Sequence, residues 1–311
     1  MSGILSLHNV SVHYGKFAVL KNISVSFSQG TIGLLGPNGA GKSTLIKTIL
    51  GLLPITTGNI QLFGTAIEQK GFREMRQKIG YVPEGDCYLP GISAVQFVAF
   101  LAELTGIETA SAMKRAHEVL EYVGLGEERY RKLEDLSFGQ RSRVKLAQAL
   151  CHNIELLILD EPTDGMDPAG KENFFHILRN IQKNTSLSIL LASHHLEDVE
   201  ALCSEIILLY NGQVLSVKKL EELHTGFENT YILELGPHSD TFAKLCSEKG
   251  FLTKQISSNQ ILVANVHDPR ILFPLLLKAQ AEILSMGPWR PTLESLFIDL
   301  IQHSGQATAS V

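Results

Sequence analysis

The chain has 311 residues, of which 44% are hydrophobic and 19% are charged, and this composition excludes an intrinsically disordered protein. Its length predicts one large domain and a smaller one. The net charge is −5 at pH 7, so the chain does not have the excess of basic residues that is typical of nucleic-acid-binding proteins. We therefore expect no nucleic-acid partner.

The four cysteines are widely separated and form no Cys-x-x-Cys pair. This pattern argues against a zinc site and a disulfide framework, and it favours a reducing, cytoplasmic setting. The N-terminus has no charged leader before an apolar core, and no apolar stretch approaches the roughly 20 residues that span a bilayer. We therefore expect a soluble chain whose role at a membrane depends on a partner.

Alternating apolar and polar residues near the start predict strands at residues 4–7, 10–14 and 23–27. Residues 31–35 form a nearly continuous apolar run, which is typical of a buried parallel strand. A glycine-rich segment follows, and residues 44–53 then have the pattern of a helix. This order of strand, glycine loop and helix is the context that a phosphate-binding loop requires.

The glycine-rich segment predicts a nucleotide-binding site formed by Gly36, Pro37, Asn38, Gly39, Ala40, Gly41, Lys42, Ser43 and Thr44. Backbone N–H groups of residues 38–43 can point at the β-phosphate, and the positive end of the following helix adds to the attraction. Lys42 is expected to contact the β- and γ-phosphates, and the Ser43 hydroxyl is expected to bind Mg²⁺. The alternative is a chance Gly- and Lys-rich turn, which the flanking strand and helix argue against.

Helical periodicity dominates residues 92–124. Because this segment lies between the phosphate loop and a later apolar strand, we expect a helical subdomain at about residues 86–150, inserted into an α/β core. The next predicted strands, two buried and two in a hairpin with an Asn-Gly turn, cover residues 156–159, 187–191, 206–210 and 213–215.

Two carboxylates follow the apolar run at residues 156–159. Asp160 is expected to hold Mg²⁺, and Glu161 is expected to polarise the attacking water as the catalytic carboxylate. The alternative is a structural Asp-Glu pair at the end of a strand.

The character of the chain changes near residue 217, and we expect domains at residues 1–216 and 217–311. The second domain is predicted to be a small α+β unit. Its predicted strands cover residues 231–235 and 260–266, and its predicted helices cover residues 241–249, 269–281 and 292–302.

The segment Ser137-Phe138-Gly139-Gln140 stands just before the Asp-Glu strand and resembles the signature of the ATP-binding cassette (ABC) superfamily. Phe138 replaces the first glycine of its commonest form. The resemblance covers residues 3–216 and includes Tyr14-Gly15, the phosphate loop, residues 164–167 and Ser193-His194. It implies an α/β fold: a P-loop NTPase core of the ABC ATPase type, with an antiparallel β-subdomain and an inserted helical subdomain, followed by the small C-terminal α+β domain.

The resemblance also implies roles for single residues. Tyr14 would stack on adenine, Asp167 would lie at a dimer contact, and His194 would contact the γ-phosphate and hold Glu161 and water in line. Ser137, Gly139 and Gln140 would complete the ATP site of the opposite subunit. The structural alternatives are an ordinary strand tyrosine for Tyr14 and a helix N-cap for Ser137. The neighbouring His195 is expected to face solvent at a helix start.

Glu84 stands in the loop of residues 79–84, where many ABC ATPases carry a glutamine that meets Mg²⁺. A carboxylate is also a hard oxygen ligand, so a Mg²⁺ role is expected for Glu84. The pattern Tyr-x-Pro-Glu resembles exporter-type ATPases that move drugs, antibiotics, lipids or polysaccharides. Residues 290–297 resemble the tail of the same subgroup.

These observations predict an ATP-binding and ATP-hydrolysing subunit of an ABC exporter, with ATP and Mg²⁺ as its cofactors. Expected partners are a second copy or a second ABC ATPase in a head-to-tail dimer, and separate membrane permease subunits that hold it at the inner face of the cell membrane. The alternatives are a non-transport ABC ATPase, which usually has two cassettes, a coiled-coil insertion or zinc cysteines, and a non-hydrolysing regulator. The sequence predicts neither the transported substrate nor the role of the second domain.

Overall fold

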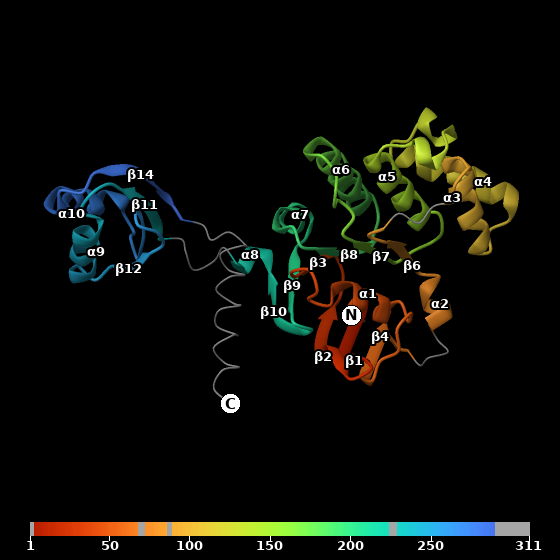
Figure 1. Cartoon of the computed structure of the whole chain (residues 1–311), viewed down its shortest axis with the longest axis horizontal. Helices are drawn as coiled ribbons and strands as arrows, with labels where there is room; N and C mark the ends of the chain where they lie inside the picture. The colour runs from red at the N-terminus through yellow and green to blue at the C-terminus, as the bar shows by residue number, and fades with distance from the viewer. Residues whose placement is uncertain (1–2, 68–71, 86–88, 224–228, 290–311) are drawn as a thin grey trace. The chain divides into compact units, whose positions relative to one another are not determined.

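The computed structural model describes residues 3–67, 72–85, 89–223 and 229–289 (Figure 1). The chain divides into two compact units, Met1–Leu220 and Glu221–Val311. The domain boundary expected after residue 216 falls inside strand β10, which ends at Lys219.

The first unit is built on a six-stranded sheet in the order β10-β9-β3-β8-β7-β6. The strands are β3 (Thr31–Leu35), β6 (Ile79–Val82), β7 (Leu156–Asp160), β8 (Ser188–Ser193), β9 (Glu205–Tyr210) and β10 (Gln213–Lys219). Every residue of β3, β7 and β8 is buried, which explains their apolar runs. Neighbouring strands are parallel except β9 and β10, which form the expected hairpin. Its turn residues Asn211 and Gly212 both have positive φ, as a tight hairpin turn requires.

A second, antiparallel sheet has the order β2-β1-β4-β5. Its strands are β1 (Leu5–Tyr14), β2 (Phe17–Phe27), β4 (Thr57–Leu62) and β5 (Thr65–Ala66). The two strands expected at residues 4–7 and 10–14 are one strand, because register shifts along β1 let pairing continue past a break in the alternation. Helix α1 (Lys42–Ile49) lies between the two sheets, and its Leu45 and Ile46 share one core with residues of both.

The opposite face of the six-stranded sheet is covered by α6 (Pro168–Asn184) and α7 (Leu196–Leu202) (Figure 1). The contact between β3 and α7 is close at Gly33, where an added Cβ would lie 2.5 Å from Cγ1 of Val199. A side chain at this position therefore requires Val199 to change its rotamer or α7 to move away from the sheet.

Replacing Gly33 with Ala should therefore destabilise the first unit, by about 1–3 kcal/mol as for other overpacked cores. Urea unfolding measures this loss. The control is Gly287→Ala, because no atom lies within 4 Å of a Cβ added at Gly287 and this residue has the extended backbone of strand β14 (Ile283–Pro288). Equal stability of the two variants would show that α7 does not pack closely against β3 at Gly33.

The helical part of the first unit contains α3 (Ala94–Leu104), α4 (Thr109–Tyr122) and α5 (Phe138–Ala149). Short 3₁₀ helices at Glu127–Tyr130 and Leu133–Asp135 join α4 to α5, and α2 (Phe72–Arg76) lies before β6. Both α3 and α5 begin with a serine capping box, which satisfies backbone N–H groups at the helix start. Within the described residues, no helix has the length and apolar character needed to cross a membrane.

The second unit contains a four-stranded antiparallel sheet in the order β12-β13-β11-β14. Helix α8 (Leu220–Leu223) spans the boundary between the units. The elements that follow it in the second unit are β11 (Tyr231–Leu235), α9 (Ser239–Glu248), β12 (Leu252–Gln255), β13 (Gln260–Ala264), α10 (Leu272–Ala279) and β14 (Ile283–Pro288). The predicted helix at 269–281 is a 3₁₀ turn, Pro269–Ile271, followed by α10. The predicted helix at 292–302 and the exporter-like tail at 290–297 lie outside the described residues.

Candidate nucleotide-binding site

The phosphate loop joins the end of β3 to the start of α1. Gly41 caps α1 with a φ of 107°, a conformation that other residues adopt only with strain. The loop thereby wraps over the N-terminus of α1, where backbone N–H groups and the helix dipole favour an anion. A cavity of about 400 Å³ lies here, lined by Val19, Pro37, Asn38, Gly39, Gly41, Lys42, Ser43, Thr44, Glu84 and Glu161.

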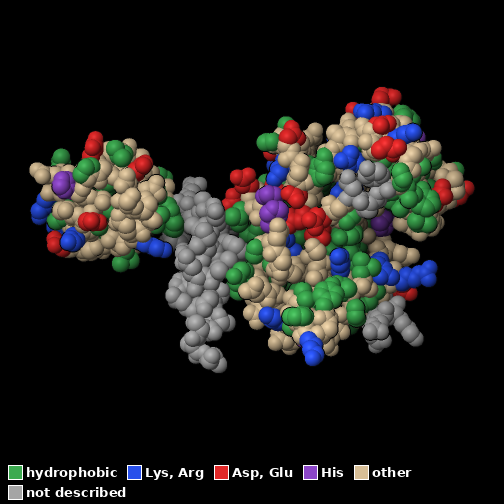
Figure 2. Space-filling model, viewed as in Figure 1, with side chains coloured by type: hydrophobic (Ala, Val, Ile, Leu, Met, Phe, Trp, Pro, Cys, Tyr) green, Lys and Arg blue, Asp and Glu red, His purple; other side chains and the backbone are tan. Residues whose placement is uncertain are grey.

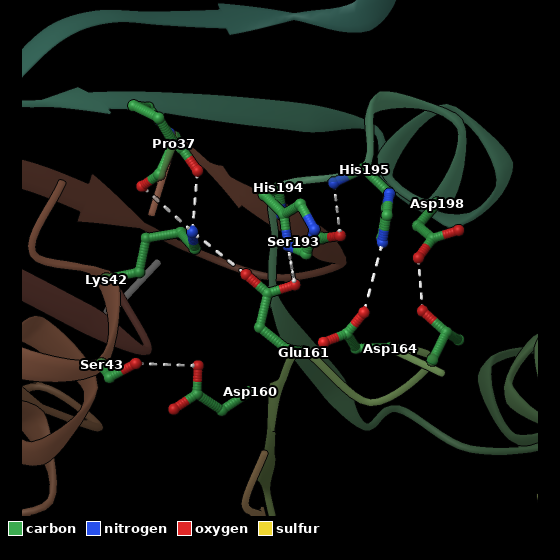
Figure 3. A network of polar contacts seen from close by, with 12 residues as sticks. Pro37, Lys42, Ser43, Asp160, Glu161, Asp164, Ser193, His194, His195 and Asp198 are labelled. Atoms are coloured by element: carbon green, nitrogen blue, oxygen red, sulfur yellow. Dashed lines mark hydrogen bonds and ion pairs between the residues drawn. The ribbon is translucent and has the colours of Figure 1, made fainter. Parts of the chain in front are cut away.

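Lys42 connects the loop to the end of β7. Its Nζ donates to the carbonyl oxygen of Gly36 at 2.7 Å and lies 3.0 Å from Oε1 of Glu161. The Lys42 and Glu161 side chains are each only 6% exposed, so this ion pair is shielded from water. The structure thus brings the predicted phosphate-binding lysine against the predicted catalytic carboxylate (Figure 3).

Asp160 faces Ser43 across the same site, with 3.4 Å between the Ser43 hydroxyl and Oδ1 of Asp160. Burial raises the pKa of Asp160, and the negative charges of Glu84 and Glu161 raise it further. The Ser43 hydrogen bond and the Lys42 charge act in the opposite direction. A cation bound by hard oxygen ligands would relieve this accumulation of negative charge.

Glu161 has an unusual backbone conformation, and its two carboxylate oxygens contact different partners. Its φ is 48°, in the left-handed region, and its N–H donates to the carbonyl of Ala192 on β8 at 2.9 Å. Oε1 faces Lys42, whereas Oε2 accepts from the backbone N–H of His194 at 3.2 Å and lies 2.8 Å from its Nδ1. This arrangement aims the carboxylate between the phosphate loop and His194 (Figure 3).

The remaining predicted residues lie elsewhere. Tyr14 ends β1 and is 49% exposed, and the cavity lining does not include it. Ser137 and Gln140 form the capping box of α5: Oγ of Ser137 accepts from the Gln140 N–H, and Oε1 of Gln140 accepts from the Ser137 N–H. Asp167 caps α6 by accepting from the Gly170 N–H at 3.2 Å.

Gly139 follows Ser137 in the first turn of α5, and the structure does not bring either residue into the cavity around Lys42 of the same chain. Phe138, the departure from the common signature, faces the loop after Glu161. A Cβ at Gly165 would lie 3.5 Å from Cζ of Phe138.

One buried network was not foreseen from the sequence. Asp198 on α7 is only 2% exposed, accepts a short hydrogen bond from the Thr163 hydroxyl and lies 3.4 Å from Nζ of Lys171. It ties the loop after Glu161 to α6 and α7 (Figure 3). The only sequence signal is an acidic residue next to apolar Val199, which a surface helix also shows.

The profile of the family described as "ABC transporter" matches residues 20–164. The linearmycin resistance ATP-binding protein LnrL of Bacillus subtilis (strain 168) is 34% identical, over 96% of this chain and 98% of that protein. The methionine import ATP-binding protein MetN of Clostridioides difficile (strain 630) is 31% identical, over 97% of this chain and 94% of that protein.

Among solved structures, the ATP-binding cassette MJ0796 is described as a dimeric post-hydrolysis state bound to ADP and Pi. It matches with a TM-score of 0.63 and 25% identity, over 70% of this chain and 98% of that one. The predicted fold class is confirmed by this likeness. The chain therefore belongs to the ATP-binding proteins of ABC transporters and is an ATP-binding, ATP-hydrolysing subunit of that kind.

Proposed function

We propose that this ATPase powers export through separate membrane subunits. The observation that carries the mechanism is the contact chain from Lys42 through Glu161 to His194 at the ends of β3, β7 and β8. Export is supported by Glu84 in its Tyr-x-Pro-Glu context and by the likeness to a protein named for linearmycin resistance. Because a methionine import protein is also similar, the direction of transport requires its own test.

The residues around the phosphate loop fit a magnesium ion. The Ser43 hydroxyl, the Asp160 carboxylate and the Glu84 carboxylate are hard oxygen donors. The pKa of Asp160 is raised first by burial and then by the negative charges of Glu84 and Glu161, and a bound cation would offset both effects. In our proposal the side chains of Ser43, Asp160 and Glu84 hold Mg²⁺, which would neutralise charge on the transferred phosphoryl group when bound.

Lys42 and Glu161 supply the next part of the mechanism. Phosphate oxygens of ATP would compete with Glu161 for the ammonium group of Lys42, since both are anionic and the loop N–H groups already favour phosphate. Once Lys42 turns toward phosphate, Oε1 of Glu161 is released to accept a hydrogen bond from the attacking water. ATP binding by Lys42 and activation of water by Glu161 are then coupled.

His194 keeps Glu161 in place while the water is oriented. Its backbone N–H donates to Oε2 of Glu161, and its Nδ1 lies within hydrogen-bond distance of the same oxygen. These two contacts restrict the movement of the carboxylate. Phosphoryl transfer depends mainly on positioning and charge, so a held carboxylate is what the reaction requires. In the proposed mechanism His194 also contacts the γ-phosphate.

The signature residues serve a second subunit in this proposal. Ser137 is exposed at the N-terminus of α5, where N–H groups favour an anion. A head-to-tail pair, formed with a second copy or another ABC ATPase, would place Ser137, Gly139 and Gln140 on the ATP held by the partner. Asp167 would lie at the contact and Tyr14 would stack on adenine.

The membrane subunits would meet the surface between Glu84 and α3, and this contact would place the chain at the cytoplasmic face of the membrane. Exposed apolar side chains on this surface include Leu89, at 48% exposure, and Phe100, at 44%. Apolar side chains that face solvent in this way are suited to burial against a partner.

Transport direction can be measured in inside-out membrane vesicles that carry the complex with its membrane subunits. With ATP added outside, an exporter should draw a labelled compound from a panel of amphipathic drugs into the vesicle lumen. The Glu161→Gln variant should lose this uptake. ATP-driven release from preloaded vesicles would identify an importer and overturn the proposed direction.

A further inference from the structure

Three side chains converge beside the catalytic carboxylate, and only one of them, His194, has a role in the proposed mechanism. Asp164 lies in the loop after β7, and His194 and His195 follow β8. One ligand atom from each lies within 4.8 Å of the other two. Figure 2 shows histidine side chains at the surface of the first unit beside acidic side chains, and Figure 3 shows the three residues together.

The contact with Glu161 determines which nitrogen of His194 can bind a cation. Nδ1 of His194 lies 2.8 Å from Oε2 of Glu161. We assign the ring proton to Nδ1, because an ionised carboxylate only accepts hydrogen bonds. The other ring nitrogen, Nε2, then keeps its lone pair. A histidine whose second nitrogen donates to a carboxylate is the usual arrangement of a metal-binding histidine.

His195 and Asp164 provide the other two groups. Nε2 of His195 lies 3.7 Å from Oδ1 of Asp164, which is too long for a hydrogen bond. Two atoms bound to one tetrahedral Zn²⁺ at about 2.1 Å lie about 3.4 Å apart, so a small shift would suffice. The backbone N–H of His195 is held by Oγ of Ser193 at 3.0 Å. The His194, His195 and Asp164 side chains are 28%, 37% and 51% exposed, so an ion can reach them.

We propose that Asp164, His194 and His195 form a binding site for a borderline divalent cation of the zinc class, and that occupation of this site stops ATP hydrolysis. Imidazole ligands favour such a cation over Mg²⁺, so the site is distinct from the oxygen ligands around Ser43. The inhibition rests on the proposed role of His194, because a cation on its Nε2 keeps that nitrogen from the γ-phosphate. The expectation against zinc concerned cysteines, and this site uses none.

Calorimetric titration of the nucleotide-free full-length chain with Zn²⁺ tests the site itself. The wild-type chain should bind one Zn²⁺ whose affinity falls by more than about tenfold in His195→Ala and in Asp164→Asn, because each loses a ligand. The matched control is His176→Ala, an exposed histidine on α6 that should leave binding unchanged. Wild-type affinity in both His195→Ala and Asp164→Asn would overturn the site.

The ATPase rate at buffered free Zn²⁺ tests the consequence. His195→Ala should keep the basal rate and resist a Zn²⁺ concentration that inhibits the wild type and His176→Ala. If His195→Ala loses Zn²⁺ binding and yet Zn²⁺ never inhibits the wild type, the site stands and the proposed role of His194 is wrong. Equal inhibition of all three proteins would overturn regulation through this site.

Discussion

Glu161→Gln should lower the ATPase rate by about 10²–10⁴-fold, the range expected when a catalytic base is lost, while ATP binding is kept. Glutamine has nearly the shape of glutamate, so the contacts with His194 and the sheet can persist. Its neutral amide accepts a water proton far more weakly, and it no longer forms the ion pair with Lys42. Lys42 is then free for phosphate, so ATP affinity should stay equal or increase.

The matched control is Glu155→Gln, which removes an exposed carboxylate just before β7 that pairs with Lys78. Its rate should remain near wild type, since exposed ion pairs contribute little. Phosphate release measures hydrolysis, and a fluorescent ATP analogue measures binding. An unchanged rate in Glu161→Gln would contradict the proposed mechanism.

Ser137→Ala should abolish hydrolysis and spare ATP binding, because Ser137 lies outside the cavity that contains Lys42. The substitution also removes the N-cap of α5, which costs about 1 kcal/mol. Ser93→Ala separates the two effects, since Ser93 forms the same capping box with Gln96 at the start of α3. Ser93→Ala should retain hydrolysis. Loss of ATP binding in Ser137→Ala would contradict a site shared between subunits.

Mixing Ser137→Ala with Lys42→Ala gives a sharper test of the shared site. Each variant alone should be inactive. In a mixed head-to-tail pair, one site contains both changes, whereas the other combines an intact Lys42 with an intact Ser137. Activity that returns on mixing supports the shared site. Two inactive proteins that stay inactive, although they form a mixed pair, would exclude it.

Much of the first unit could be predicted because its buried strands and phosphate loop have strong local signals. Runs such as residues 31–35 are apolar throughout, as burial on both faces requires. The short strands β6, β12 and β14 were not predicted. β12 and β14 lie at the edges of their sheet and have exposed residues, and β6 has only four residues. Neither kind of strand has an alternating apolar and polar pattern long enough to identify it as a strand from the sequence.

In the candidate site, too, residues in short motifs could be predicted, whereas contacts between segments far apart in the sequence could not. Lys42, Ser43, Asp160 and Glu161 were predicted from motifs of a few residues each. Asp198 was not, because its partners Thr163 and Lys171 meet it only when α6 and α7 pack together. The pairing of His195 with Asp164 was missed for the same reason, since one follows β8 and the other follows β7.

The sequence by itself determined the chemistry available to this protein: a phosphate loop, two acidic residues after a buried strand, a signature segment and a histidine. These are local patterns, and each needs only its neighbours along the chain. The tertiary structure decided which groups meet. Because β3, β8 and β7 are adjacent in the sheet, the segments after them bring Lys42, His194 and Glu161 into one contact chain. The same sheet order places Asp164 beside two histidines.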